Sequence, residues 1–326
     1  MKDLVENFPA QLQDALAIGE KFDFQKPVTG IHHILVTGLG GSGIGGTIVS
    51  ELLADQCHVP VTVNKDYFLP AFVSDKTFVI VCSYSGNTEE TIQAMEEALK
   101  RKARIACITS GGHIGELARK NGCDMILIPG GMPPRACLGY SLTQLLIVLH
   151  KAGLAGDFRG QLSSSIDLVS GLQDEIKEEA SKIAAALYKK LPVIYAVDGY
   201  NGVATRFRQQ INENSKMLCW HHVLPEMNHN ELVGWAEPHP ECAVVILRNE
   251  SDYSRTQKRI EISKDVFSKY AGSVNEIWSK GNTPLERSIY LIHLTDWVSC
   301  FLADKKGIDA TEVNIINHLK GSLAKI

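Results

Sequence analysis

The sequence predicts an α/β protein in which two doubly wound parallel sheets pack together. Short apolar runs alternate with helical segments along most of the 326 residues, which is typical of parallel strands buried beneath helices. The alternation pauses at the glycine-rich segment 153–160 and then resumes. Because a chain of this length exceeds one comfortable core, we expect two domains, at residues 1–152 and 153–326.

Five apolar runs of strand length lie in the first half, at 33–37, 61–63, 78–82, 105–108 and 125–128. We expect an amphipathic helix over 4–18 before them and further helices near 44–55, 88–101, 114–121 and 139–152. The stretch near 88–101 begins with acidic residues and ends with basic ones, as the helix dipole favours.

The second half follows the same order of elements without repeating the sequence. A charged helix is expected over 165–190, before strands at 193–197, 218–223, 243–247 and 274–278. Long helices are expected at 253–271, 284–304 and 309–320. We interpret the pattern as a weak structural duplication, with a doubly wound sheet in each half.

Composition narrows the class of protein. A formal net charge of −4 without a basic stripe argues against a nucleic-acid or anionic-membrane partner. No apolar run approaches the ~20 residues that span a bilayer, and the N-terminus has no apolar core of signal-peptide length, so we expect a cytoplasmic protein. The eight cysteines show no CxxC spacing, which argues against a disulfide scaffold or a structural zinc site.

A glycine-rich loop follows the first strand. Gly38, Gly40 and Gly43 match the G-x-G-x-x-G pattern of dinucleotide sites, which also need an acidic residue at the end of the second strand. Asp66 lies two residues past that strand, so the match to a nicotinamide site is poor. A turn that serves only packing is the other open interpretation.

A hydroxyl-rich loop, 83–88, follows the strand 78–82 and opens the next helix. Ser83, Ser85 and Thr88 place three hydroxyl groups beside a helix N-terminus, whose free N–H groups favour an anion. Thr88 taken alone could be only a helix N-cap. Three hydroxyl groups on one spot suit a terminal phosphate monoester better than a pyrophosphate between two nucleosides.

The segment Ser83–Thr91, SYSGNTEET, resembles the signature of the sugar isomerase (SIS) domain. Together with Gly38–Gly46, GLGGSGIGG, it makes nearly the whole chain similar to the bifunctional phosphoglucose/phosphomannose isomerases. The resemblance implies two SIS-type domains and a metal-independent interconversion of glucose 6-phosphate and mannose 6-phosphate with fructose 6-phosphate, without a cofactor. It also implies a set of substrate-phosphate ligands: Gly41, Ser42, Ser83, Ser85 and Thr88.

A phosphate cradle binds the substrate but takes no part in the reaction, so the catalytic groups must lie elsewhere in the chain. The segment Gln210–Lys216 matches the family pattern Q-x-N-E-N-S-K, which makes Glu213 the proton-shuttling base by resemblance. Arg135, after two prolines, matches the arginine that the family places against the enediolate. From the residues alone, Glu213 could be a surface or capping group and Arg135 a surface residue at the start of a helix.

Ring opening needs a group that both takes and gives a proton. His229 aligns with the histidine that the family uses for this step, and in related isomerases this histidine comes from the neighbouring subunit, so a homodimer is implied. Lys320 matches the lysine near the end of the family's C-terminal helix. The family often has a small hydroxyl residue before this lysine, where Thr311 and Val313 lie here.

Two competing interpretations concern the second half. His221, His222, His229 and Glu231 could suggest a metal site, but no H-x-x-x-H or H-E-x-x-H pattern supports one. His221 and His222 fall on one strand and point to opposite faces, so a structural role is favoured for both. A non-catalytic SIS regulator is the alternative function. Such sensors usually carry a DNA-binding or effector module, whereas this sequence shows no basic helix-turn-helix segment and retains Glu213, His229 and Lys320.

Overall fold

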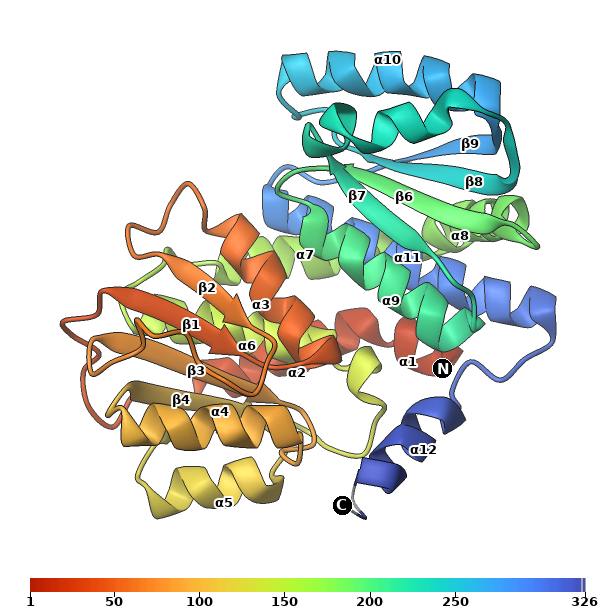
Figure 1. The fold of residues 1–326 in the computed structure, drawn as a ribbon. Helices are drawn as coiled ribbons and strands as arrows, with labels where there is room; N and C mark the ends of the chain where they lie inside the picture. The colour runs from red at the N-terminus through yellow and green to blue at the C-terminus, as the bar shows by residue number, and fades with distance from the viewer. Residues whose placement is uncertain (324, 326) are drawn as a thin grey trace.

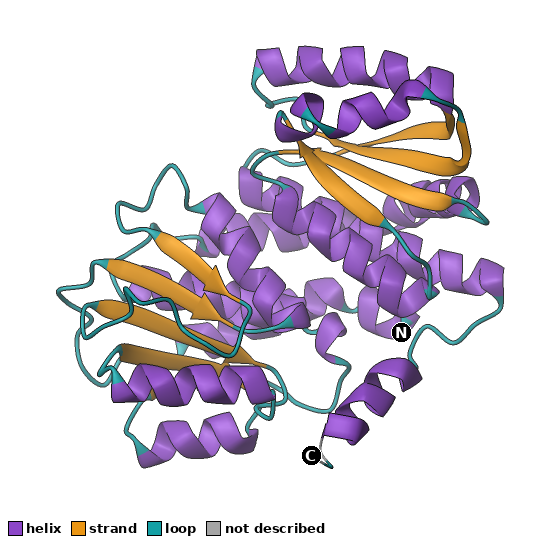
Figure 2. Ribbon diagram, in the orientation of Figure 1, coloured by secondary structure: helices purple, strands orange, loops and turns teal. Residues whose placement is uncertain are grey.

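The computed structural model describes residues 1–323 and 325, which form two parallel sheets with a layer of helices between them (Figures 1 and 2). Five strands form the first sheet, in the order β2 (Val61–Asn64), β1 (His33–Thr37), β3 (Thr77–Ser83), β4 (Arg104–Thr109) and β5 (Asp124–Leu127). Four strands form the second, in the order β7 (Trp220–Leu224), β6 (Leu191–Val197), β8 (His239–Arg248) and β9 (Ala271–Trp278). The two parallel sheets confirm the predicted fold class.

Helices cover both faces of the first sheet, as its apolar strands require. Leu35 and Val79 pack toward α4 (Glu89–Lys100) and α5 (Gly112–Lys120), while alternate residues such as Ile34 pack into the larger core. That core contains side chains of α2 (Phe8–Glu20), α3 (Gly40–Leu52) and α6 (Leu138–Lys151).

The second sheet has α10 (Ser254–Tyr270) on its outer face, whereas α8 (Gln173–Leu187), α9 (Asn201–Ser215) and α11 (Pro284–Lys306) lie on its inner face (Figure 1). The short helix α1 (Lys2–Glu6) contacts α11, and α7 (Arg159–Gly171) lies between α2 and α11. The last helix, α12 (Asn314–Leu323), projects from the body and has no buried residue.

Three predicted helices differ from the observed ones. The helix expected over 4–18 is divided into α1 and α2, because Pro9 at the start of α2 has no N–H to continue the preceding turn. The helix expected over 165–190 is divided into α7 and α8 just after Gly171, a poor helix former. The helix expected over 309–320 begins only at Asn314, since preceding carbonyl groups accept hydrogen bonds from side chains of the site.

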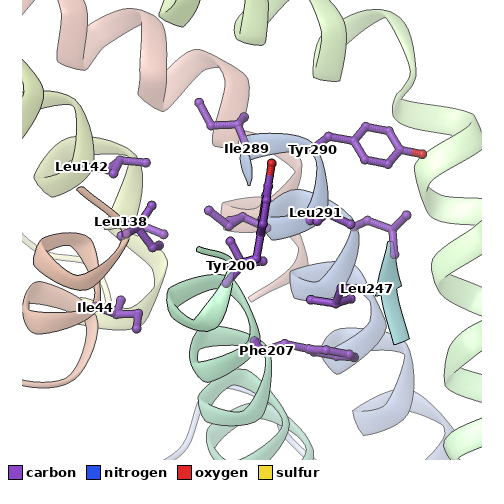
Figure 3. Packing of buried hydrophobic residues seen from close by; sticks show 14 of the residues in the cluster. Ile44, Leu138, Leu142, Tyr200, Phe207, Leu247, Ile289, Tyr290 and Leu291 are labelled. Carbon is purple, nitrogen blue, oxygen red and sulfur yellow. The ribbon is translucent and has the colours of Figure 1, made fainter. Parts of the chain in front are cut away.

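One hydrophobic core runs through both halves of the chain (Figure 3). Ile44 and Leu138 of the first half belong to the same buried cluster as Phe207, Leu247 and Leu291 of the second. A continuous core fixes the position of one sheet against the other. The domain boundary at residue 152 stays a prediction.

Helices α3 and α9 lie side by side between the sheets and run in opposite directions. The N–H of Gly202, at the start of α9, donates to both carboxylate oxygens of Glu51, at the end of α3, over 2.9 and 3.0 Å. At the other end of the crossing, Nε of Arg135 donates to Oδ1 of Asn214, near the end of α9, over 2.7 Å, and the neighbouring Pro134 lies against Gly41 at the start of α3. The end of α9 therefore lies close to the start of α3.

None of the helices in residues 1–323 and 325 is long and apolar enough to span a membrane.

Replacing Glu51 by glutamine should change how stability depends on pH. Burial raises the pKa of Glu51 from 4.5 to about 7, so the folded protein holds this proton more tightly than the unfolded chain does. The free energy of unfolding should therefore fall as the pH rises between those two values. Glu51→Gln keeps an oxygen acceptor for Gly202 without a charge, and at pH 8 it should be more stable than the wild type by about 1–3 kcal/mol.

Urea unfolding at pH 5 and pH 8 measures this difference. Asp55→Asn, which removes an exposed carboxylate just beyond α3, is the matched control. Equal stabilisation of Glu51→Gln at both pH values would contradict the prediction.

Candidate active site

Two loops meet at the carboxyl edge of the first sheet, where β1 leads into α3 and β3 leads into α4. The hydroxyl of Ser42 accepts a hydrogen bond from the backbone N–H of Tyr84 over 3.1 Å, which ties the two loops together. The hydroxyl of Ser83 donates to that of Thr88 over 3.1 Å, while Ser85 is exposed. The predicted phosphate ligands are thus brought to one edge of the sheet.

The helices that begin at these loops have no side-chain caps. Leu39 and Thr88 occupy the N-cap positions of α3 and α4, and neither side chain accepts a hydrogen bond from the helix. Thr88 is therefore not the simple N-cap that the sequence left open. Uncapped N–H groups, together with the positive end of each helix dipole, suit an anion.

Two glycines allow the backbone to come this close. A Cβ on Gly41 would lie 2.7 Å from the carbonyl oxygen of Pro134, so the start of α3 could not approach the segment that carries Arg135. Gly86 has a φ of +69°, and a Cβ there would lie 1.8 Å from the carbonyl oxygen of Gly111. Steric exclusion therefore requires glycine at both positions.

Arg135 lies in the short helix η1 (Pro134–Ala136) and joins the two halves of the chain. Its side chain is buried, and its Nε donates to Oδ1 of Asn214 over 2.7 Å. Its Nη2 donates to the carbonyl groups of Ala310 and Thr311 over 2.7 and 2.9 Å. Its Nη1 lies 3.5 Å from a carboxylate oxygen of Glu213.

Glu213 lies in the last turn of α9 and is partly open to solvent. Its side chain is 27% exposed, so a carboxylate beside a buried arginine remains accessible to a ligand. A hollow of about 240 Å³ adjoins it, lined on the other side by residues that include Val313 and Ile316. A base, a fixed positive charge and a space beside them are therefore present together.

Lysines hold the chain around Glu213. Lys216, which ends α9 in the left-handed conformation, donates through Nζ to the carbonyl groups of Glu213, Asp309 and Glu312. Nζ of Lys306 donates to the carbonyl groups of Ser215 and Lys216 over 2.7 and 3.0 Å. These cations satisfy carbonyl groups at the negative end of the helix, and they fix the segment that leads into α12.

The support beneath Arg135 was missed by the sequence analysis. Arg206 forms a buried ion pair with Asp296 of α11 over 2.6 Å and donates to the carbonyl of Arg135. Asn214, which accepts from Arg135, donates in turn to the hydroxyl of Ser299 over 2.9 Å. In the sequence, the one hint of this support was that Asn214 directly follows the candidate base Glu213.

His229 is not brought to Glu213 within one chain. His229 is exposed at the end of the short helix η2 (Glu226–His229), which follows β7 near the start of α9, whereas Glu213 lies at the end of α9. The length of α9 alone separates these two ends by roughly 20 Å. Lys320 is exposed on α12.

The neighbouring histidines His221 and His222 have different hydrogen-bond partners. Nε2 of His221 lies 2.9 Å from the hydroxyl of Thr205, whereas Nδ1 of His222 accepts from the N–H of Val223. Among the described residues, no three His, Cys, Asp or Glu side chains lie close enough to hold a metal ion.

Comparison with known proteins identifies both halves of the chain. The model of the SIS domain matches residues 29–131, and that of the bacterial phospho-glucose isomerase C-terminal SIS domain matches residues 176–323. The fold is similar to that of the C-terminal domain of glucosamine-fructose-6-phosphate aminotransferase from Francisella tularensis, with a TM-score of 0.79 at 14% identity over 95% of this chain and 97% of that one.

Two curated relatives match in sequence over almost their whole length. A bifunctional phosphoglucose/phosphomannose isomerase from Aquifex aeolicus is 36% identical over 93% of this chain and 94% of its own. One from Caldicellulosiruptor bescii is 41% identical over 100% of this chain and 99% of its own. Identity at this level along the full length shows that the chain belongs to the family of bifunctional phosphoglucose/phosphomannose isomerases.

Proposed function

We propose that the protein is an aldose–ketose isomerase that interconverts glucose 6-phosphate and mannose 6-phosphate with fructose 6-phosphate. One observation carries this proposal. The carboxylate of Glu213 and the guanidinium of Arg135 lie 3.5 Å apart, and the segment of Arg135 contacts the start of α3, one of the two uncapped helices. A base, a fixed cation and an anion-binding cradle are the groups that this reaction needs.

The cradle would hold the substrate phosphate at the starts of α3 and α4. Backbone N–H groups of the two helices donate to the phosphate oxygens, assisted by the hydroxyl groups of Ser42, Ser83, Ser85 and Thr88. The phosphate is remote from the reacting carbons, so its binding energy orients the sugar before the chemistry begins.

Glu213 would move one proton between C2 and C1. Removal of the C2 proton makes that carbon planar, so both epimers yield the same cis-enediolate, and one base serves both substrates. Negative charge develops on the enediolate oxygens, where the guanidinium of Arg135 stabilises it. Because Arg135 is already held by Asn214 and by two carbonyl groups, it need not reorganise during the reaction.

Ring opening is assigned to His229 and Lys320, and it requires a second copy of the chain. Exposed at the opposite end of α9, His229 is well placed to reach the site of a partner subunit in a homodimer. Contacts within the chain hold its loop in place: Asn228 donates to the hydroxyl of Ser263, and Tyr195 donates to Glu231. Lys320, on α12, would approach from the other side of Glu213.

A coupled assay for fructose 6-phosphate formation tests the proposed function. We expect turnover of both aldose phosphates, with a rate that is unchanged by EDTA. Binding of these sugar phosphates without turnover of either would instead support the non-catalytic regulator.

Glu213→Gln should abolish most of the turnover while leaving substrate binding nearly intact. The amide retains the shape of the side chain but cannot accept the C2 proton, so kcat should fall by about 10²–10⁴-fold with little change in the dissociation constant. Steady-state kinetics and calorimetric titration measure the two quantities.

The matched control is Glu312→Gln, which removes a nearby carboxylate that pairs with Lys216. This variant should keep most of the turnover. Retained turnover in Glu213→Gln would rule out Glu213 as the base.

Mixing two inactive variants tests whether His229 crosses the dimer interface. In a dimer of one Glu213→Gln chain and one His229→Ala chain, both substitutions fall in one site if His229 is shared, and the other site is intact. Statistical exchange of subunits should then restore about a quarter of the wild-type rate. No recovery after demonstrated subunit exchange would place both residues in the same chain's site.

A further inference from the structure

A cluster of cationic and imidazole groups lies where the two halves meet, beside the cradle. Helices α3 and α9 contact each other at this junction, and β2 and β7 are the edge strands of the two sheets (Figure 1). Lys65 follows the end of β2, Arg208 lies on α9, and His221 lies on β7. None of the three belongs to the catalytic set described above.

Contacts with neighbouring residues place each member of the cluster. Cε of Lys65 lies 3.7 Å from where a Cβ on Gly43 would be, so this side chain runs past the first turn of α3. Nε2 of His221 lies 2.9 Å from the hydroxyl of Thr205. Arg208 is three residues beyond Thr205, on the same side of α9.

Several polar groups of the cluster lack protein partners, although Nε2 of His221 contacts Thr205 and Asn201. Neither Lys65 nor Arg208 takes part in an ion pair among the described residues. Nε of Arg208, Nδ1 of His221 and Oγ1 of Thr47 on α3 are buried and have no hydrogen-bond partner there. Buried polar atoms are nearly always paired in folded proteins, so the unpaired nitrogens of Arg208 and His221 point to a ligand.

The positive field of the cluster is only partly compensated. Burial, and then the charges of Arg208, His222 and Lys65, lower the pKa of His221 to about 4. Partial desolvation beside α3 and the charge of Arg208 also lower the pKa of Lys65, whereas Glu51 raises it. Glu51 is the one acid that acts on Lys65 among the described residues, and its carboxylate is already bonded to the N–H of Gly202.

We propose that Lys65, Arg208 and His221 form a second anion site, next to the substrate cradle, for a phosphate-type dianion. The planar fork of an arginine matches the oxygens of a phosphate, and the exposed Lys65 is accessible to an anion from solvent. The dianion is either free phosphate or the second phosphate of a sugar bisphosphate whose first phosphate occupies the cradle. This site does not depend on the isomerase activity.

Inorganic phosphate is the probe, and the His221 ring, followed by NMR with labelled histidine, is the reporter. Ser85→Ala combined with Thr88→Ala weakens the cradle, so the response of the second site can be separated from it. We expect phosphate to shift the His221 resonances and to raise its pKa from about 4, because a bound anion favours the imidazolium.

Lys65→Gln and Arg208→Gln should each weaken this response by about tenfold or more, the effect of one charge-assisted bond. Lys76→Gln is the control with the same change of charge, since Lys76 lies at the opposite edge of the first sheet. An unmoved His221 signal, or an unchanged response in Lys65→Gln, would overturn the proposal. Lys65 is exposed, so its substitution tests the site even if Arg208→Gln fails to fold.

Calorimetry in the wild-type background distinguishes the two sources of the dianion. If Lys65→Gln weakens binding of fructose 1,6-bisphosphate but not of fructose 6-phosphate, the bisphosphate is the ligand. If only the response to inorganic phosphate is lost, the ligand is free phosphate. Either result supports the second site, whereas equal binding of all three probes to Lys65→Gln and wild type overturns it.

Discussion

The candidate site depends on the hydrogen bonds and the ion pair made by the guanidinium of Arg135. It is buried where the first half of the chain meets the end of α9, and it holds Asn214, Glu213 and the segment 310–311 in one arrangement. A buried cation is stable only when paired and hydrogen-bonded, and the pairing here comes from parts of the chain more than 75 residues away. The same contacts therefore stabilise the fold and fix the position of Glu213.

The two halves share an order of elements, but the corresponding helices α3 and α9 contribute to the candidate site through different ends. The helix after the first strand of each sheet, α3 or α9, begins at a loop on the carboxyl edge. The start of α3 has no side-chain cap, whereas the first turn of α9 is already bonded to the carboxylate of Glu51. Of these two helices, α3 keeps its N-terminus open for an anion, whereas α9 contributes to the candidate site through its other end.

Local pattern was enough to predict the strands and most helices. Strands such as 77–83 are buried throughout, and buried parallel strands read as unbroken apolar runs. The errors fell at breaks inside long helical stretches, at Pro9, after Gly171 and before Asn314. The first two breaks leave a sequence signal. The third does not, because residues 309–313 remain outside the helix through hydrogen bonds to Arg135 and Lys216, which are distant in sequence.

The sequence by itself determined the two-sheet architecture, because buried strands and the helices between them leave local patterns. It predicted the phosphate cradle from two short loops, and it predicted Glu213 as the base only by resemblance to the family. Tertiary structure decided which candidates meet. It placed Arg135 against Glu213, and it kept His229 at the opposite end of α9. It also revealed Arg206, Asp296 and the cluster around Lys65, because charges that interact across two sheets leave no spacing in the sequence.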